Sequence, residues 1–112
     1  MKPICTTRSD GTTEWKLDGK LHRSDGPAVE HTDGARYWYL NDTLHRTDGP
    51  AIECSDGTKE WYLNGKRHRE DGPACEYADG TTMWYVNGKE VKPKELVNRG
   101  YMTEADLMLY LI

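Results

Sequence analysis

Four tryptophans stand 23 residues apart in this chain, at Trp15, Trp38, Trp61 and Trp84, and most residues between them repeat as well. The unit is plainest in GPAIECSDGTKEWYLNGKRHREDG, from Gly49 to Gly72. A fixed period of this length is typical of a repeat array, in which each unit buries its apolar face against its neighbours. This period constrains the fold more than any other feature, and it favours an extended binding surface.

Each repeat contains two dipeptides that favour tight turns. In the repeat from Ala28 to Pro50 they are Asp33-Gly34 and Asn41-Asp42. Such pairs readily adopt the positive φ angles of the primed hairpin turns. The repeat then divides into strands over residues 28–32, 35–40 and 43–46, followed by a corner over residues 47–50. We therefore predict an all-β repeat array of antiparallel β-hairpins with a 23-residue period.

Two-residue turns at these dipeptides predict a register for the hairpins. They place Val29 opposite Trp38 on one side and His45 opposite Trp38 on the other. Side chains alternate along a strand, so Trp38, Val29 and the equivalent Ile52 would share one face and the tyrosines the other. Three-residue loops would shift this register.

The repeat pattern ends at Val91, and a helical pattern follows. Pro93 suits a first helical turn, and Gly100 suits a stop. Thr103 and Asp106 resemble a capping box for a last helix that carries the apolar residues Leu107, Met108, Leu111 and Ile112. We predict a hairpin array over residues 1–92, with about four repeats of which the first and last are incomplete, and a helical C-terminal cap of one or two short helices over residues 93–112. The cap would cover the open edge of the sheet or the end of its core.

Composition limits the partners and the compartment. Fifteen Lys and Arg are interleaved with nineteen Asp and Glu, and the net charge of −4 argues against nucleic acid. No apolar run approaches the ~20 residues of a membrane span, and no signal peptide follows Met1, so we expect no integral membrane segment. Three cysteines at different repeat positions fit free thiols in a reducing cytoplasm.

The phrase WYLNGKRHREDGPA, from Trp61 to Ala74, resembles the variant MORN (membrane occupation and recognition nexus) repeats of bacterial, phage and large-virus proteins. The resemblance covers Cys5 to about Val91. It implies a sheet of successive β-hairpins, and it implies no single activity. Classical MORN proteins have been proposed to touch membranes, and many act as scaffolds.

Three histidines in register, His22, His45 and His68, are the nearest approach to a metal site. Three strands per repeat would separate them by ~14 Å, whereas zinc ligands converge within ~2.1 Å of one ion. We therefore predict no metal and no cofactor. Every candidate acid or base recurs as a repeat element, while active sites need unlike groups in one pocket, so we predict that the protein is not an enzyme.

Two sets of residues are candidates for binding. The first is a tyrosine stripe on the face opposite the tryptophans, where large amphipathic side chains flanked by Arg and Glu are typical of an interface: Tyr37, Tyr39, Tyr62, Tyr85 and Met83. The alternative is that a second layer covers the stripe. The second set is Arg23, Arg46 and Arg69, whose guanidinium groups would hold an anionic ligand. The alternative is that they pair with nearby glutamates.

These residues lead to three functional hypotheses. The first is a non-catalytic protein-binding module, of which a phage-encoded inhibitor of a host or defence protein is one form. The second is a sponge for nucleotides or other small anions, held by the arginines. The third is a membrane-surface scaffold, which the net charge of −4 makes least favourable. Homo-oligomers are compatible with each hypothesis.

Overall fold

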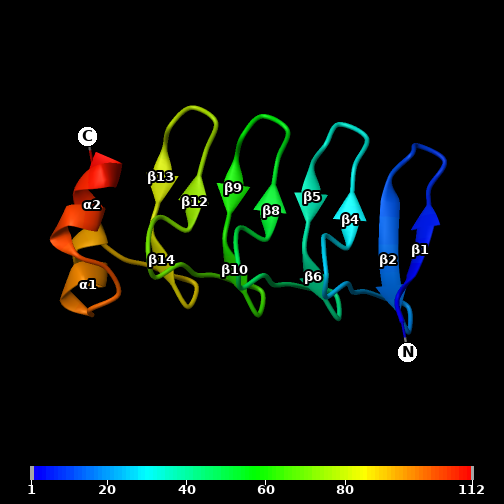
Figure 1. Cartoon of the computed structure of the whole chain (residues 1–112), viewed down its shortest axis with the longest axis horizontal. Helices are drawn as coiled ribbons and strands as arrows, with labels where there is room; N and C mark the ends of the chain where they lie inside the picture. Colours follow the sequence, from blue (N-terminus) through cyan, green and yellow to red (C-terminus); the bar gives the residue numbers. More distant parts are fainter. Residues whose placement is uncertain (1, 112) are drawn as a thin grey trace.

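The computed structural model describes residues 2–111. Within that range a main sheet of nine strands follows the order β1-β2-β4-β5-β8-β9-β12-β13, with β3 beside β2. Each repeat adds one hairpin along the long axis, and two helices stand at the C-terminal end (Figure 1). The molecule extends 46 × 29 × 19 Å. The predicted all-β array of antiparallel hairpins with a helical cap is confirmed.

The strands are short, and the first hairpin has the longest ones. The main sheet contains β1 (Ile4–Thr7), β2 (Thr13–Leu17), β3 (Lys20–Leu21), β4 (Val29–Glu30), β5 (Arg36–Tyr37), β8 (Ile52–Glu53), β9 (Lys59–Glu60), β12 (Cys75–Glu76) and β13 (Thr82–Met83). Three small hairpins lie below it in Figure 1: β6 (Tyr39–Leu40) with β7 (Thr43–Leu44), β10 (Tyr62–Leu63) with β11 (Lys66–Arg67), and β14 (Tyr85–Val86) with β15 (Lys89–Glu90).

The tryptophan is the residue at which the chain leaves the main sheet. The N–H of Trp38 donates to the carbonyl of Ala51 in the next repeat (2.8 Å), and its carbonyl accepts from the N–H of His45 in its own small hairpin (3.1 Å). The predicted single strand over residues 35–40 is therefore wrong, since it divides into β5 and β6 at Trp38. Only two strands of each later repeat enter the main sheet, so neighbouring repeats lie about 10 Å apart rather than ~14 Å.

The upper turns are longer than predicted. Val29 pairs with Tyr37, and the N–H of His31 donates to the carbonyl of Ala35 (2.9 Å), which leaves a three-residue loop. Asp33 accepts a hydrogen bond from the N–H of Ala35 (2.9 Å), and Gly34 has φ +97°. A side-chain-stabilised turn closed by a left-handed glycine gives this loop length.

The longer loop changes which residues share a face. The predicted pairing of Val29 with Trp38 is wrong, and so is the placement of Val29 and Ile52 on the tryptophan side, because both pair with Tyr37. The lower turns do have two residues: Tyr39 pairs with Leu44, and Asn41 and Asp42 both have positive φ. The predicted position of His45 opposite Trp38 is therefore confirmed.

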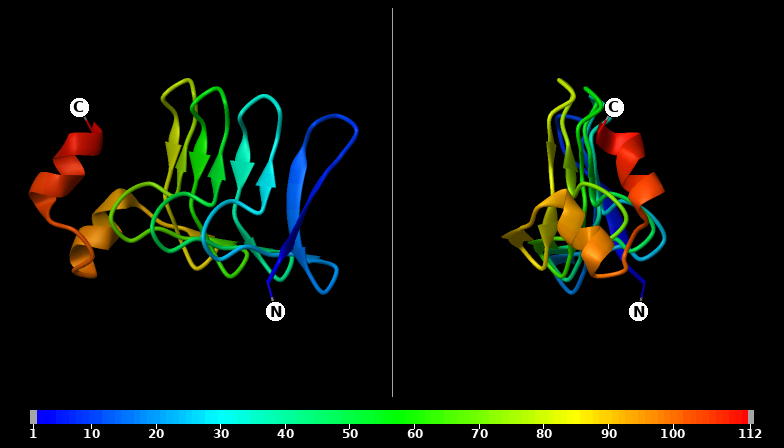
Figure 2. Two further views of the ribbon diagram at one scale, coloured as in Figure 1. Left: turned by 45° about the vertical axis from the view of Figure 1, so that its right-hand side comes forward. Right: turned by 90° about the vertical axis from the view of Figure 1, so that its left-hand side faces the viewer.

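The main sheet is a single layer, and the corners between repeats lie to one side of it (Figure 2). One face, here called the tyrosine face, carries a row of paired residues across the strands: Glu14, Val29, Tyr37, Ile52, Glu60, Cys75 and Met83. The next row points to the opposite face, here called the tryptophan face, and its middle alternates in charge: Glu30, Arg36, Glu53, Lys59 and Glu76. Opposite charges thus face each other across each strand pair, which stabilises the register.

Two helices, α1 (Pro93–Asn98) and α2 (Glu104–Leu111), form the cap. A capping box precedes α2, since the N–H of Asp106 donates to Thr103 Oγ1 (3.1 Å) and the N–H of Thr103 donates to Asp106 Oδ2 (3.2 Å). The cap closes an apolar cluster with the last repeat: Trp84, Val86, Leu96, Met102 and Leu107. Of the predicted apolar residues of α2, Leu107 is buried, Met108 and Leu111 are exposed, and Ile112 lies outside the described residues.

Candidate functional site

The arginines of the tryptophan face are held by their own chain. The guanidinium carbon of Arg46 lies 3.8 Å from the centre of the Trp38 ring. Its Nε donates to Asp48 Oδ1 (2.9 Å), and its Nη1 donates to the carbonyl of Pro50 (3.0 Å) and to Glu53 Oε2 (3.5 Å). The Arg46 side chain therefore ties the corner between two repeats to the sheet and to the tryptophan.

The same contacts recur in the neighbouring repeats. Arg23 lies 4.3 Å from the Trp15 ring and Arg69 lies 3.8 Å from the Trp61 ring. Arg69 also reaches Glu76 (3.4 Å), as Arg46 reaches Glu53, and both glutamates lie in one row. Trp38 and Trp61 consequently share a face, as predicted. An anion that bound these arginines would compete with the aspartate and glutamate of every repeat.

Each of the three in-register histidines, His22, His45 and His68, accepts a hydrogen bond from the next repeat. Nδ1 of His45 lies 3.0 Å from the N–H of Asn64, which opens the lower turn of the following repeat. His22 and His68 make the same bond to the turns 19 residues ahead. The histidines are therefore linkers between repeats, and the sequence signal is the recurrent spacing of His and Asn. Val91 takes the histidine position of the last repeat, where a helix follows in place of another turn.

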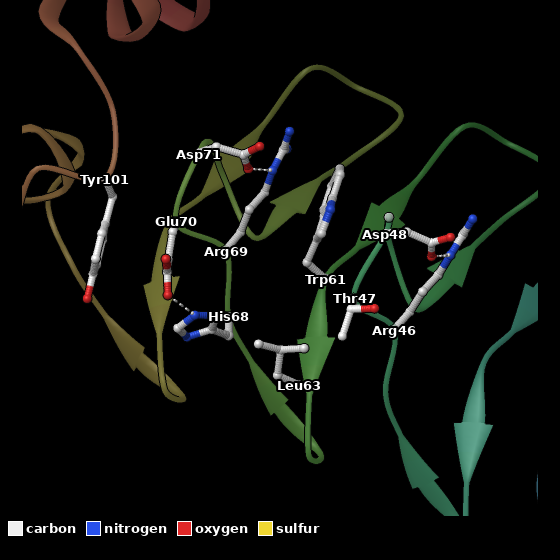
Figure 3. A pocket seen from close by; sticks show the side chains of 11 residues that line it. Arg46, Thr47, Asp48, Trp61, Leu63, His68, Arg69, Glu70, Asp71 and Tyr101 are labelled. Atoms are coloured by element: carbon white, nitrogen blue, oxygen red, sulfur yellow. Dashed lines mark hydrogen bonds and ion pairs between the residues drawn. The ribbon is translucent and has the colours of Figure 1, made fainter. Parts of the chain in front are cut away.

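The corners between repeats form walls around open hollows on the tryptophan face. The larger hollow has a volume of about 740 Å³, with Trp61 and Leu63 beside His68, and with Tyr101 of the cap segment at one end (Figure 3). A second hollow of about 490 Å³ lies one repeat earlier, around Trp38 and Leu40. Arg46 lines both hollows. The sequence alone shows no pocket, because these hollows form between separate repeats.

The predicted tyrosine stripe is half-buried throughout: Tyr37, Tyr39, Tyr62, Tyr85 and Met83. Tyr37 and Met83 lie in the paired row of the tyrosine face, whereas Tyr39, Tyr62 and Tyr85 lie in the small hairpins, on β6, β10 and β14. Between these side chains Val29, Ile52 and Cys75 are 7%, 9% and 0% exposed. No second layer lies over the middle of this face within residues 2–111 (Figure 2). The side chains around Val29, Ile52 and Cys75 must therefore shield them from solvent. The tyrosines are the largest of these side chains, and the outer parts of their rings are exposed to solvent.

A polar network on the tyrosine face was not evident from the sequence. Arg67 Nε donates to the Tyr62 hydroxyl (3.3 Å), and Arg67 Nη2 donates to Glu60 Oε1 (3.3 Å). The guanidinium of Arg67 also lies 5.3 Å from the Tyr85 ring. Burial raises the pKa of the Tyr62 phenol and of the Cys75 thiol. The equivalent of Arg67 one repeat earlier is Leu44, which also pairs with a tyrosine, so the stripe is apolar toward β6 and charged toward β14.

Among residues 2–111 no group of three His, Cys, Asp or Glu side chains is arranged to hold a metal ion. The free thiols differ in exposure, with Cys5 exposed, Cys54 half-buried and Cys75 buried. In the same range no helix combines the length and the apolar character that crossing a membrane requires.

No family model, curated protein or solved structure matches this chain. The resemblance to variant MORN repeats therefore stays a prediction from the repeat phrase.

Proposed function

We propose that the chain is a non-catalytic protein-binding module whose partner docks on the tyrosine face. One observation carries the proposal: Tyr39, Tyr62 and Tyr85, all half-buried, recur at the same position of β6, β10 and β14, the small hairpins that border the single-layer main sheet. Tyrosine contributes a large and stiff contact area, with a hydroxyl that bonds at low entropic cost. A row about 10 Å apart, repeat by repeat, suits an extended partner surface.

The neighbours of the tyrosines add specificity. Leu44 pairs with Tyr39, and Arg67 pairs with Tyr62. A partner that fits would therefore present an apolar segment near β6 and a carboxylate near Arg67. An inhibitor of another protein, phage-encoded or not, would act through the same contacts, because occlusion of a partner needs a surface and no chemistry.

The test is affinity capture from the source cell with the wild-type chain and the variant Tyr62→Ala as baits, followed by mass spectrometry and titration of the captured protein. We expect one protein whose dissociation constant rises about 30-fold with Tyr62→Ala, the effect of an interface residue that contributes about 2 kcal/mol. Lys59→Ala, on the tryptophan face, is the control and should bind like wild type. Since Tyr62 is half-buried, each variant is titrated well below its own melting temperature.

A partner retained equally by Tyr62→Ala and lost with Lys59→Ala would contradict the proposal and move the interface to the tryptophan face. The absence of any protein retained by the wild type and the control, yet lost with the tyrosine variant, would contradict it as well.

A second candidate function, the sequestration of nucleotides or other small anions, is favoured by the two hollows that share Arg46. Its test is a thermal-shift screen with nucleotides. A ligand that binds only the folded state raises the melting temperature by mass action, and Arg46→Ala should abolish that rise. Arg99→Ala, in the cap and away from both hollows, should preserve it.

A further inference from the structure

We propose that the outer edge of β1 pairs with β1 of a second molecule in antiparallel orientation, so that two chains form a two-fold dimer with one continuous sheet. This surface is distinct from the tyrosine face, and the proposal does not depend on the proposed function. It rests on the hydrogen-bonding pattern, the composition and the exposure of the first strand.

The hydrogen bonds of the first hairpin show which backbone groups of β1 point outward. The N–H of Arg8 donates to the carbonyl of Thr12 (2.8 Å), and Thr6 lies opposite Glu14. Bonded residues alternate along an antiparallel strand, so Thr6 also faces β2. The N–H and C=O groups of Cys5 and Thr7 then point away from the sheet, where no strand among residues 2–111 pairs with them.

The composition of β1 does not protect this edge. All four residues of Ile4–Thr7 are exposed, and the Ile4 side chain is 70% exposed. Edge strands of soluble proteins are usually blunted by a lysine, a proline, a bulge or a covering element. The sequence Ile-Cys-Thr-Thr has no charge and no proline, and three of its residues are β-branched, which favours strand pairing.

The strand is complementary to itself. A two-fold axis at Thr6 places Cys5 opposite Thr7 of the second molecule and Thr7 opposite its Cys5. All outward N–H and C=O groups of the two residues are then used, giving four hydrogen bonds.

The two ends of the array differ in a way that limits assembly to a dimer. The cap helices stand at the end of the array opposite to β1 (Figure 1). Pairing of two identical edges about a two-fold axis is closed, whereas head-to-tail pairing would continue into filaments. The main-sheet strand nearest the cap, β13, has only two residues.

The first experiment is sedimentation analysis of the wild-type chain, of Thr7→Pro and of Thr7→Val. Proline removes the outward N–H of Thr7 without affecting the bonds of β1 to β2, and valine keeps the N–H. Two of the four hydrogen bonds are lost per dimer with proline, so its dimer dissociation constant should rise by about tenfold or more. Thr7→Val should match wild type, and the melting temperature measured at a monomeric concentration shows whether each variant folds.

The second experiment is oxidative cross-linking in a Cys5→Ser background. Thr6 would face its own copy across the axis at a non-hydrogen-bonded site, where Cα atoms lie about 4.5 Å apart, which a disulfide spans. Thr6→Cys should therefore give a disulfide-linked dimer at low oxidant. Thr82→Cys, an exposed threonine on β13, is the matched control and should remain monomeric.

A monomeric wild type at millimolar concentration would overturn the proposal. A dimer unaffected by Thr7→Pro would also overturn it, and loss of that dimer with Leu109→Ser would assign the contact to the exposed apolar side chains of α2. Oligomers that grow beyond two chains with concentration would show head-to-tail pairing and exclude the two-fold arrangement.

Discussion

The inner repeats and the last repeat of this array cover the same tryptophan in different ways. Trp38 and Trp61 are half-buried and each stacks on an arginine that is also bonded to the next corner. Trp84 is 6% exposed and lies in an apolar cluster with Leu96, while the Tyr110 ring meets it edge-on at 5.6 Å. The tryptophan of an inner repeat is therefore covered by the arginine of its own repeat, and the tryptophan of the last repeat is covered by the cap.

The difference shows how such an array ends. Each repeat presents two groups that the residues after it contact: the face of its tryptophan ring and the Nδ1 acceptor of its histidine. Where no successor follows, Val91 stands in place of the histidine, and Tyr110 of the cap bonds to Arg69 Nη2 (3.3 Å) while covering Trp84. The cap thus supplies apolar burial at the one tryptophan that lacks a following corner.

The largest expected effect tests whether the cap holds the last repeat by apolar burial. Leu96 is 1% exposed at the centre of the cluster. Leu96→Ala should lower the free energy of unfolding by about 3 kcal/mol, through lost burial and a cavity. Urea unfolding followed by tryptophan fluorescence measures it. Leu109→Ala is the control on the same cap, since that side chain is 71% exposed, and it should change stability by less than about 0.5 kcal/mol.

A smaller effect tests the polar cover of an inner repeat. Arg46→Ala should lower the free energy of unfolding by about 2 kcal/mol, because it removes the stack on Trp38 and the bond to the Pro50 carbonyl. The bond to Asp48 adds little, since that carboxylate is 81% exposed. Arg46→Lys keeps the charge and should recover less than half of the loss. Full recovery by lysine would mean that charge alone holds the corner.

The histidine link between repeats should contribute less again. His45→Ala removes the acceptor of the Asn64 N–H, which lies at an exposed turn, and should cost about 1 kcal/mol. His45→Asn keeps an acceptor in the place of Nδ1 and should retain much of the stability. Hydrogen exchange of the Asn64 amide reports the same bond directly, and unchanged exchange in His45→Ala would show that the link is not formed in solution.

The smallest expected effect is a dependence on pH that the upper turns show and the cap does not. Hydrogen bonds from the backbone N–H groups of Thr58 and Thr81 lower the pKa of Asp56 and Asp79 below 3.8. A lowered folded-state pKa means that the charged form is favoured by folding, so this stabilisation is complete above pH 3.8 and is lost as the pH falls through the folded-state value. The amide resonances of Thr58 and Thr81 should titrate with midpoints below 3.8, and that of Tyr101 in the cap segment should not follow them. Midpoints at or above 3.8 would contradict the turn geometry.

Several features could be predicted from the sequence because they depend on local contacts. The two turns in each repeat and the capping box at Thr103 and Asp106 each involve residues within a few positions of one another, and the period is visible in the recurrence of the phrase itself. The recurrence of the tyrosines at one position of each repeat was also visible in the sequence, although the chain leaves the main sheet between Tyr37 and Tyr39. The exposure of the stripe was not predictable, since a covering layer can come from anywhere in a chain.

The predicted register of the main sheet was wrong for a physical reason. Asp33-Gly34 is compatible with a two-residue turn, yet the bond from Ala35 to the Asp33 carboxylate makes the loop one residue longer. A shift of one residue moves a side chain to the other face of the sheet. Val29 and Ile52 consequently flank Tyr37 on the tyrosine face, and Cys75 lies further along the same row.

The sequence by itself determined that this protein is an array of like hairpins with a different C-terminal end, because a repeated phrase must form a repeated local structure. Only the tertiary structure decided how those hairpins join. The backbone of the tryptophan forms hydrogen bonds both to the main sheet and to a small hairpin. The arginine side chain donates to a carbonyl of the corner that follows it, and the histidine accepts a hydrogen bond from a turn 19 residues later. The bond from Trp38 to Ala51 and the bond from Asn64 to His45 cross between repeats, so they depend on a spacing of about 10 Å in space rather than 23 residues in the chain.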